Sequence, residues 1–223
     1  MLAKLIFNLC DTFATCGKAS IVNIYQDYIL PPIVNFVMSN RELVEYRRRC
    51  LSIARGRVLE IGIGSGINLP FYGREVSAIY GIDPSSGLLG RAAKQQAGKP
   101  LLIRGSAETP PLETGSFDTI VTTWTLCSIP DASRALREMG RILRRDGRLL
   151  FVEHGLAPDR QIMRWQNRLA PCSKCLSGGC HLNRKIDELI AAAGFHIEQL
   201  DTGYLRGRNL LTYMYEGVAR FVR

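Results

Sequence analysis

The sequence predicts an α/β fold built on a doubly wound, mostly parallel sheet. A short apolar strand at residues 57–61 runs directly into a glycine-rich turn at residues 62–66. Strand-like and helix-like segments then alternate through most of the chain. Two final strand-like segments, residues 195–199 and 211–215, suit a closing antiparallel pair. This order of elements places helices on both faces of a parallel sheet.

The first elements precede the glycine turn. Residues 1–40 are rich in aliphatic residues and predict an N-terminal helical extension, which comes before a single domain of residues 41–223. The extension fits either a lid over the acceptor pocket or a helix lying at a membrane interface. A helix is expected over residues 40–54, with Asn40 as its N-cap. Another helix is expected to begin near Ile67.

The later elements follow from apolar periodicity. Strands are expected at residues 78–82, 100–104, 116–122 and 148–152, with helices at residues 83–96, 131–143 and 183–193. Asp146-Gly147 predicts a turn. Residues 165–169 suit a helix, whereas residues 171–180 are rich in Cys, Ser and Gly and predict a loop.

Composition and charge exclude several classes of protein. The 223 residues are 46% hydrophobic and 22% charged, which are ordinary globular values. No apolar run is long enough to predict a transmembrane helix. The net charge of +9 comes partly from four arginines within 41–49 and six within 134–148, which we expect on solvated helix faces. No nucleic-acid-binding module is recognisable. Seven scattered cysteines favour reduced thiols and a cytoplasmic protein.

The glycine turn carries the strongest functional signal. Its sequence fits E-x-G-x-G-x-G, with Glu60 on the strand, and Ile67 stands where a dinucleotide-binding fingerprint would need a third glycine. Glycines here let a ligand lie against bare backbone amides. Asp83 ends the next strand, about 20 residues after the glycines, where an acid can accept hydrogen bonds from both ribose hydroxyls. The pattern predicts a ligand that contains a ribose.

Four further motifs accompany the glycine turn. They are residues 122–129 (TTWTLCSI), residues 151–155 (FVEHG), Trp165-Gln166, and residues 178–184 (GGCHLNR). With E-x-G-x-G-x-G they resemble the class I methyltransferases that use S-adenosylmethionine, in the type 11 group. They resemble in particular the bacterial relatives of the animal endoplasmic-reticulum enzymes that methylate alkyl thiols. The resemblance implies a Rossmann-like fold and S-adenosyl-L-methionine as cofactor.

The resemblance also implies roles for individual residues. The glycines would lie along the methionine part of the cofactor, Asp83 would hold the ribose, and the segment after the third strand would flank the adenine. Residues 123–126 would cover the cofactor near its sulfonium. The implied cofactor-binding residues are Glu60, Gly62, Gly64, Ser65, Gly66, Asp83, Pro84, Ser106, Ala107, Glu108, Thr123 and Leu126.

Catalytic candidates end the fifth strand. Glu153 and His154 stand beside the expected acceptor pocket, and His154 is suited to general-base catalysis. The alternative for His154 is a structural histidine bonded to a backbone carbonyl. The expected acceptor-pocket residues are Cys127, Trp165, Gln166, His181, Asn183 and Arg184.

Alternative structural roles remain open for several of these residues. Cys127 suits packing better than a nucleophile, because direct methyl transfer needs no methyl-enzyme intermediate. Asn183 could instead cap the helix that follows it, and Trp165 could be a core residue. The cysteines of residues 172–180 have the residue types of a zinc site but not the spacing of a paired knuckle, so no metal is expected.

The expected function is direct methyl transfer to a small or lipophilic acceptor. A thiol sulfur is the first candidate. The alternatives are a phospholipid headgroup nitrogen, a quinone-type acceptor, or a non-catalytic membrane-associated module that keeps the cofactor fold. The expected partner is therefore a small or lipophilic molecule, with peripheral membrane contact and no nucleic acid.

Overall fold

A computed structural model describes residues 41–223, except residues 96, 206 and 208. The side chains of residues 175 and 176 are also outside the description. The expected extension of residues 1–40 and the expected Asn40 cap lie outside the described residues. The helix expected at 40–54 is present as α4, Arg41–Ser52.

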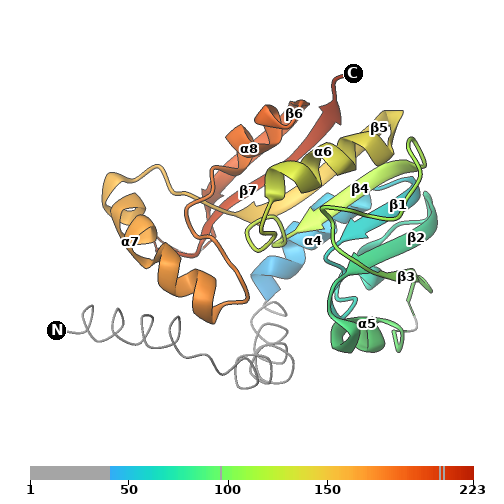
Figure 1. Cartoon of the computed structure of the whole chain (residues 1–223), viewed down its shortest axis with the longest axis horizontal. Helices are drawn as coiled ribbons and strands as arrows, with labels where there is room; N and C mark the ends of the chain where they lie inside the picture. The colour runs from blue at the N-terminus through green and yellow to red at the C-terminus, as the bar shows by residue number, and fades with distance from the viewer. Residues whose placement is uncertain (1–40, 96, 206, 208) are drawn as a thin grey trace.

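A single sheet of seven strands organises the described residues (Figure 1). Its spatial order is β3-β2-β1-β4-β5-β7-β6. The first five strands in this order are parallel, β7 is antiparallel to β5, and β6 is antiparallel to β7. The doubly wound, mostly parallel sheet with an antiparallel end is therefore confirmed. The strands are β1 Gly56–Ile61, β2 Val76–Asp83, β3 Leu101–Arg104, β4 Phe117–Thr123, β5 Leu143–His154, β6 Phe195–Tyr204 and β7 Tyr213–Phe221.

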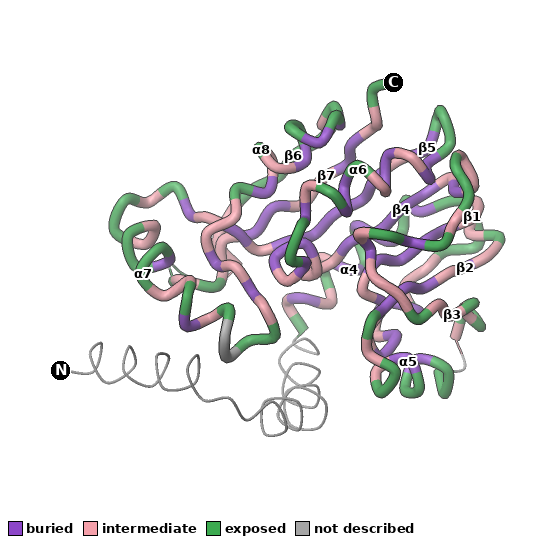
Figure 2. The backbone as a smooth tube through the Cα atoms, in the orientation of Figure 1, coloured by how far each residue is buried: buried purple, intermediate pink, exposed green. Residues whose placement is uncertain are grey.

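Helices cover both faces of this sheet (Figure 1). Helix α4 packs through Cys50 and Leu51 against one face. Helices α6 (Ala132–Ile142) and α8 (Ile186–Ala192) pack through residues such as Leu136 and Ile190 against the other face. Figure 2 shows the buried backbone concentrated in the strands between these layers. The strand order reverses between β1 and β4, and ligands of such sheets bind at that point, outside the carboxyl ends of the strands.

Helix α7, Arg160–Leu176, corrects the expected loop at 171–180. Its first part matches the helix expected at 165–169, but the helix continues through Pro171 to Leu176. Proline removes one helical hydrogen bond without preventing a helix, and the next residue, Cys172, is buried. Only the turn after Leu176 keeps the expected loop character. Among the described helices, none has the combination of length and apolarity that crossing a membrane requires.

Three smaller expectations are also corrected. The helix expected near Ile67 is a single 3-10 turn, η2 Leu69–Phe71, which ends where Tyr72 takes an extended conformation with φ −70° and ψ 132°. The turn expected at residues 146–147 is an irregular first part of β5, with a register shift against β4. Helix α5, Ser86–Ala92, is shorter than expected and is capped by Ser85, whose Oγ accepts from the Leu88 N–H.

Candidate functional site

The glycine turn leaves its backbone bare at the carboxyl end of β1. Gly62, Gly64 and Gly66 all have positive φ, at 68°, 56° and 79°. A Cβ at Gly62 would lie 2.5 Å from Cγ2 of Thr125, so the turn packs tightly against the segment after β4. A Cβ at Gly64 would meet nothing closer than the Gly62 oxygen at 3.9 Å. Gly64 thus borders open space in which a ligand can approach the backbone.

Asp83 lies against this turn, as expected. Its side chain is 7% exposed. Oδ2 accepts a hydrogen bond from the Gly64 N–H at 3.0 Å, and Oδ1 accepts from the Ser85 N–H at 2.8 Å. Burial raises the pKa of Asp83, although these two hydrogen bonds oppose the shift. Pro84, the next residue, is exposed.

Glu60 supports the turn from below in a buried polar network. Its Oε1 accepts from Nδ2 of Asn68 and its Oε2 accepts from the Tyr72 hydroxyl, both at 2.8 Å. Asn68 Nδ2 also donates to Oγ1 of Thr123 at 2.9 Å, which ties β1 to the end of β4. Burial raises the pKa of Glu60 to about 7. Both carboxylate oxygens are used within the protein, so Glu60 positions the turn.

Arg47 of α4 is a site residue that sequence reasoning missed. It was expected on a solvated face, and that expectation is wrong, because Arg47 is only 2% exposed. Its Nε donates to Oδ1 of Asn68 at 2.9 Å, and its Cζ lies 4.6 Å from the centre of the Trp124 ring. Nη1 is buried and has no hydrogen-bond partner among residues 41–223 as described. Burial lowers the pKa of Arg47 to about 10, so it remains a cation at neutral pH.

The signal for Arg47 was present in the sequence. Leu43, Arg47, Cys50 and Leu51 form the buried stripe of α4, at helical spacing. An arginine on an apolar stripe is expected to be buried, and its guanidinium then needs hydrogen-bond acceptors from the protein or from a ligand. The unpaired Nη1 beside the glycine turn fits an anionic group such as the carboxylate of S-adenosylmethionine.

The remaining cofactor candidates surround the same edge of the sheet. Ser106 Oγ donates to Oε2 of Glu108 at 3.0 Å, and Oε1 of Glu108 accepts from the Asp131 N–H at 2.7 Å. This segment follows β3, the neighbour of β2, and Ala107 is buried within it. Ser65, in the glycine turn, is 9% exposed. Leu126, after β4, is fully buried.

Glu153 organises the segment after β4 through one of its two carboxylate oxygens. It is fully buried at the end of β5. Its Oε1 accepts from the N–H groups of Thr125 and Leu126, both at 3.1 Å. The carboxylate therefore fixes the segment that packs on Gly62. This geometry gives Glu153 a positioning role, while its Oε2 is buried without a partner among the described residues.

His154 lies in a cluster with two cysteines. Its Nε2 is 3.2 Å from Sγ of Cys180, and the ligating atoms of Cys127, His154 and Cys180 all lie within 4.8 Å of one another. Both cysteines are buried and reduced. His154 Nδ1 is buried without a partner in the described part of the chain. The alternative of a structural histidine bonded to a backbone carbonyl is therefore wrong.

Two of the expected acceptor-pocket residues join this cluster to the segment after β4. The His181 N–H donates to the Cys127 carbonyl at 2.8 Å. Arg184 donates through Nη1 to the Leu126 carbonyl and through Nη2 to the Pro130 carbonyl, the latter at 3.2 Å. Cys127, His181 and Arg184 are thus brought together at the carboxyl ends of β4 and β5.

The other three expected pocket residues are not part of this cluster. Gln166 is fully buried and uses its amide internally, accepting from the Ala157 N–H and donating to the carbonyls of Gly155 and Leu210, all at 2.9 Å. Trp165 is 43% exposed, so it is not a core residue either. Asn183 bonds to Asn167 of α7, and Lys185, not Asn183, takes the N-cap position of α8.

An apolar cavity of about 440 Å³ opens beside the cluster. It lies between α7, the turn after it and the β6–β7 connection, and its lining includes Leu169, Cys172, Leu182 and Leu211. Leu169 and Leu182 also pack against Cys127 and Cys180. The volume lies within the range of small-molecule pockets. The cavity can therefore hold the apolar part of an acceptor.

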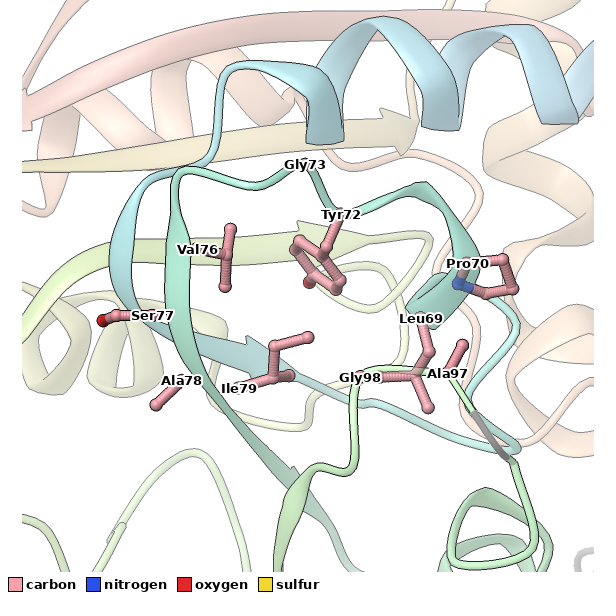
Figure 3. A pocket seen from close by; sticks show the side chains of 10 residues that line it. All are labelled: Leu69, Pro70, Tyr72, Gly73, Val76, Ser77, Ala78, Ile79, Ala97 and Gly98. Carbon is pink, nitrogen blue, oxygen red and sulfur yellow. The ribbon is translucent and has the colours of Figure 1, made fainter.

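A smaller cavity of about 270 Å³ lies away from these residues (Figure 3). Figure 3 shows side chains of η2, of the first half of β2 and of residues 97–98 around it. Its nearest β2 residue to the site, Ile79, is four residues before Asp83, or about 13 Å along an extended strand. Neither the three glycines of the turn nor Asp83 lines this cavity, although its lining residue Tyr72 bonds to Glu60.

Comparison with known proteins shows similarity to methyltransferases. A model described as "Methyltransferase domain" matches residues 59–151. The thiol S-methyltransferase TMT1B of Rattus norvegicus is 31% identical over 153 residues, covering 65% of this chain and 62% of that protein. The phosphatidylethanolamine N-methyltransferase of Cereibacter sphaeroides is 35% identical over 104 residues, covering 44% and 51%. The chain thus spans less than two thirds of the length of each of these relatives.

A solved structure supports the fold. The YcgJ protein of Bacillus subtilis has a TM-score of 0.55 and 24% identity, covering 73% of this chain and 72% of its own. The bare glycine turn, the buried Asp83 beside it and the unpaired Arg47 donor fit the ribose and carboxylate of the expected cofactor. Residues 59–151 are thus similar to a methyltransferase domain, and these contacts suit S-adenosylmethionine, the cofactor that the sequence motifs led us to expect.

Proposed function

We propose that this protein transfers a methyl group from S-adenosylmethionine to the sulfur of a small lipophilic thiol. The observation that carries the proposal is the apolar cavity of about 440 Å³ beside Cys127 and Cys180, next to the segment that packs on the glycine turn. An apolar cavity suits a neutral acceptor with a hydrocarbon part. The similarity to a thiol S-methyltransferase over 153 residues supports the choice of sulfur.

The protein's task in such a reaction is to position the reactants and exclude water. S-adenosylmethionine supplies an activated methyl group on a sulfonium. Asp83 would hold the ribose hydroxyls, and Arg47 Nη1 would hold the carboxylate. Glu153 and Arg184 fix the segment after β4, which separates the glycine turn from the cavity. These contacts would bring the sulfonium carbon and the acceptor atom to one edge of the sheet.

The acceptor itself needs little activation. A thiol with the pKa of free cysteine, about 8.5, is a few per cent thiolate at neutral pH, and thiolates are strong nucleophiles. Its sulfur forms the new S–C bond while the sulfonium C–S bond breaks, and the thiol proton passes to solvent or to a nearby base. A nitrogen acceptor on a lipid headgroup is the second candidate, because the phosphatidylethanolamine N-methyltransferase is similar over 104 residues.

Methyl transfer from labelled S-adenosylmethionine to a panel of acceptors tests the proposal. The panel holds hydrogen sulfide, a short alkyl thiol, a long alkyl thiol, phosphatidylethanolamine vesicles and a quinol precursor. We expect label in the alkyl thiols, with the longer chain favoured because of the apolar cavity. Label only in the vesicles or in the quinol would replace the thiol assignment. The alkyl alcohol of matched length is the control.

A further inference from the structure

We propose that Cys127, His154 and Cys180 bind a zinc ion, and that its fourth position receives the acceptor's sulfur as a thiolate. The second part of this inference rests on the proposed function, whereas the ion site itself does not. The three residues come from three separate places: the segment after β4, the end of β5, and the turn after α7. Nothing in their spacing along the chain predicts that they meet.

The distances suit a tetrahedral ion. Zn–S bonds of about 2.3 Å and Zn–N bonds of about 2.0 Å place neighbouring ligand atoms about 3.6 Å apart. Cys180 Sγ and His154 Nε2 are 3.2 Å apart, and all three ligand atoms lie within 4.8 Å of one another. Shifts of about 1 Å or less would complete the geometry. Three protein ligands with one open position are typical of a catalytic zinc site, whereas structural sites have four.

Each ligand is held by contacts that do not involve the cluster. The segment of Cys127 is fixed by the Glu153 carboxylate and by the bond from the His181 N–H to the Cys127 carbonyl. That second bond also fixes the turn that carries Cys180. His154 lies within the β5–β7 ladder, opposite Met214. The site is thus organised before any ion arrives, which lowers the cost of binding.

Simple packing explains this cluster less well. Cys127 and Cys180 could be small apolar residues, since Leu182 and Leu169 surround them. His154 does not fit that explanation, because its only polar contact in the described chain is the sulfur of Cys180, and its Nδ1 is buried and unpaired. Cys50, by contrast, lies in the apolar core beneath α4 with no metal-ligating group of this kind around it in the described structure. It is the matched control.

A thiol acceptor in the apolar cavity could reach the open fourth position of the zinc ion. Leu169 and Leu182 line the apolar cavity and also contact the cysteines, so an acceptor's chain in the cavity can place its sulfur at the ion. Binding to zinc releases the thiol proton to solvent and leaves a thiolate. Its electron pair forms the S–CH₃ bond, the sulfonium C–S bond breaks, and the cofactor leaves as a neutral thioether. The ion's charge does not change.

Metal binding is tested first, without any activity measurement. Reduced, metal-free protein is titrated with Zn²⁺ against a coloured chelator, and with Co²⁺ followed by thiolate-to-cobalt charge-transfer absorption. We expect one ion per chain in the wild type and in Cys50→Ala. We expect Cys127→Ala and Cys180→Ala to weaken binding by more than about 100-fold. Circular dichroism shows whether each variant is folded, and a zinc-induced rise in Tm should occur only in proteins that keep both cysteines. Equal binding by all four proteins, or no stoichiometric binding by the wild type, would overturn the site.

Binding of the acceptor's sulfur as the fourth ligand is tested second, on the cobalt-loaded protein without cofactor. An alkyl thiol should add charge-transfer intensity at saturation, and the alcohol of equal length should not. An unchanged spectrum would overturn the fourth-ligand assignment. Thiol methylation that persists in metal-free protein would overturn the inference and leave the proposed function intact. A metal site that binds thiol in a protein that methylates only lipid would keep the site and replace the proposed function.

Discussion

The two sides of the site are built in different ways. The cofactor side, made by the glycine turn, Asp83 and residues 106–108, is joined mainly by short links: Asn68 bonds to Glu60 eight residues away, and Gly64 to Asp83 19 residues away, although Asn68 also bonds to Thr123 across 55 residues. The acceptor side, made by residues 124–131, His154 and residues 177–184, depends on longer links. Cys180 meets His154 across 26 residues, and Arg184 meets Leu126 across 58.

This difference means that the cofactor side tolerates less change in sequence than the acceptor side. The cofactor side uses backbone amides and glycines, which tolerate little change because the ligand lies against the chain itself. The acceptor side uses side chains from loops that a fixed scaffold holds together, and such loops can change without altering the sheet. Relatives of this chain include enzymes named for different acceptors, as this arrangement allows.

The largest expected effect is on the cofactor side, from Gly62→Ala. Its φ is +68°, and the new Cβ would lie 2.5 Å from Thr125 Cγ2. Left-handed strain and overpacking together predict a loss of about 2 to 5 kcal/mol in the free energy of unfolding, with loss of cofactor binding. Denaturant unfolding and calorimetric titration measure both. Gly90→Ala is the control: it lies within α5, nothing is within 4 Å of its added Cβ, and it should stabilise by up to about 1 kcal/mol. Equal effects at both positions would mean that the close contact with Thr125 is unimportant.

The next effect concerns the buried network beneath the turn. Burial raises the pKa of Glu60 from 4.5 to about 7, so the folded state favours the protonated acid. The stability that Glu60 contributes is therefore full below pH 4.5 and is lost as the pH rises through 7. Glu60→Gln cannot ionise, so its stability relative to the wild type should rise by about 3 kcal/mol between pH 4.5 and pH 8. Urea unfolding across this range measures the difference. A constant difference would show that Glu60 stays ionised in the fold, with Arg47 as its partner.

Most elements of the fold could be predicted from local patterns. The β1 strand, the glycine turn, Asp83 and the α6 helix all follow from apolar periodicity and turn residues. The misses have physical causes. Residues 171–180 were expected to form a loop because they are rich in Cys, Ser and Gly, yet α7 continues through Pro171 to Leu176 and buries Cys172. The turn expected at residues 146–147 is absorbed into β5, because pairing with β4 begins at Leu143 and resumes at Arg148 after a register shift.

The site residues also divide into those that local sequence patterns predict and those that they do not. The glycines and Asp83 could be placed because each has a local conformational reason. Arg47 was misplaced because its charge was given more weight than its position on the apolar stripe of α4. The contact between Cys180 and His154 could not be predicted from the sequence, because the loops that bring the two residues together have no periodic pattern.

A sharper test of the cofactor side compares two variants with two ligands. S-adenosylhomocysteine carries both ribose and carboxylate, whereas methylthioadenosine carries the ribose alone. Arg47→Met should weaken S-adenosylhomocysteine by about 30-fold, through loss of a charged hydrogen bond, and leave methylthioadenosine within about threefold. Asp83→Ala should weaken both ligands alike. Calorimetric titration gives the four affinities. If Arg47→Met weakened both ligands equally, Arg47 would be supporting Asn68 and not holding the carboxylate.

The smallest effect should fall on the acceptor side alone. Arg184 holds the carbonyls of Leu126 and Pro130, so Arg184→Ala frees the segment that separates the cofactor from the cavity. We expect the KM for the acceptor to rise by about 10-fold, as for a loss of about 1.4 kcal/mol, while the Kd of S-adenosylhomocysteine changes less than about twofold. Arg168→Ala is the matched control, because Arg168 lies on exposed α7 above Trp165 and contributes no bond to that segment. Steady-state kinetics and titration on the same preparations give both numbers. A matching loss of cofactor affinity in Arg184→Ala would show that the two sides share one support, through Leu126 and Thr125, and that they cannot vary independently.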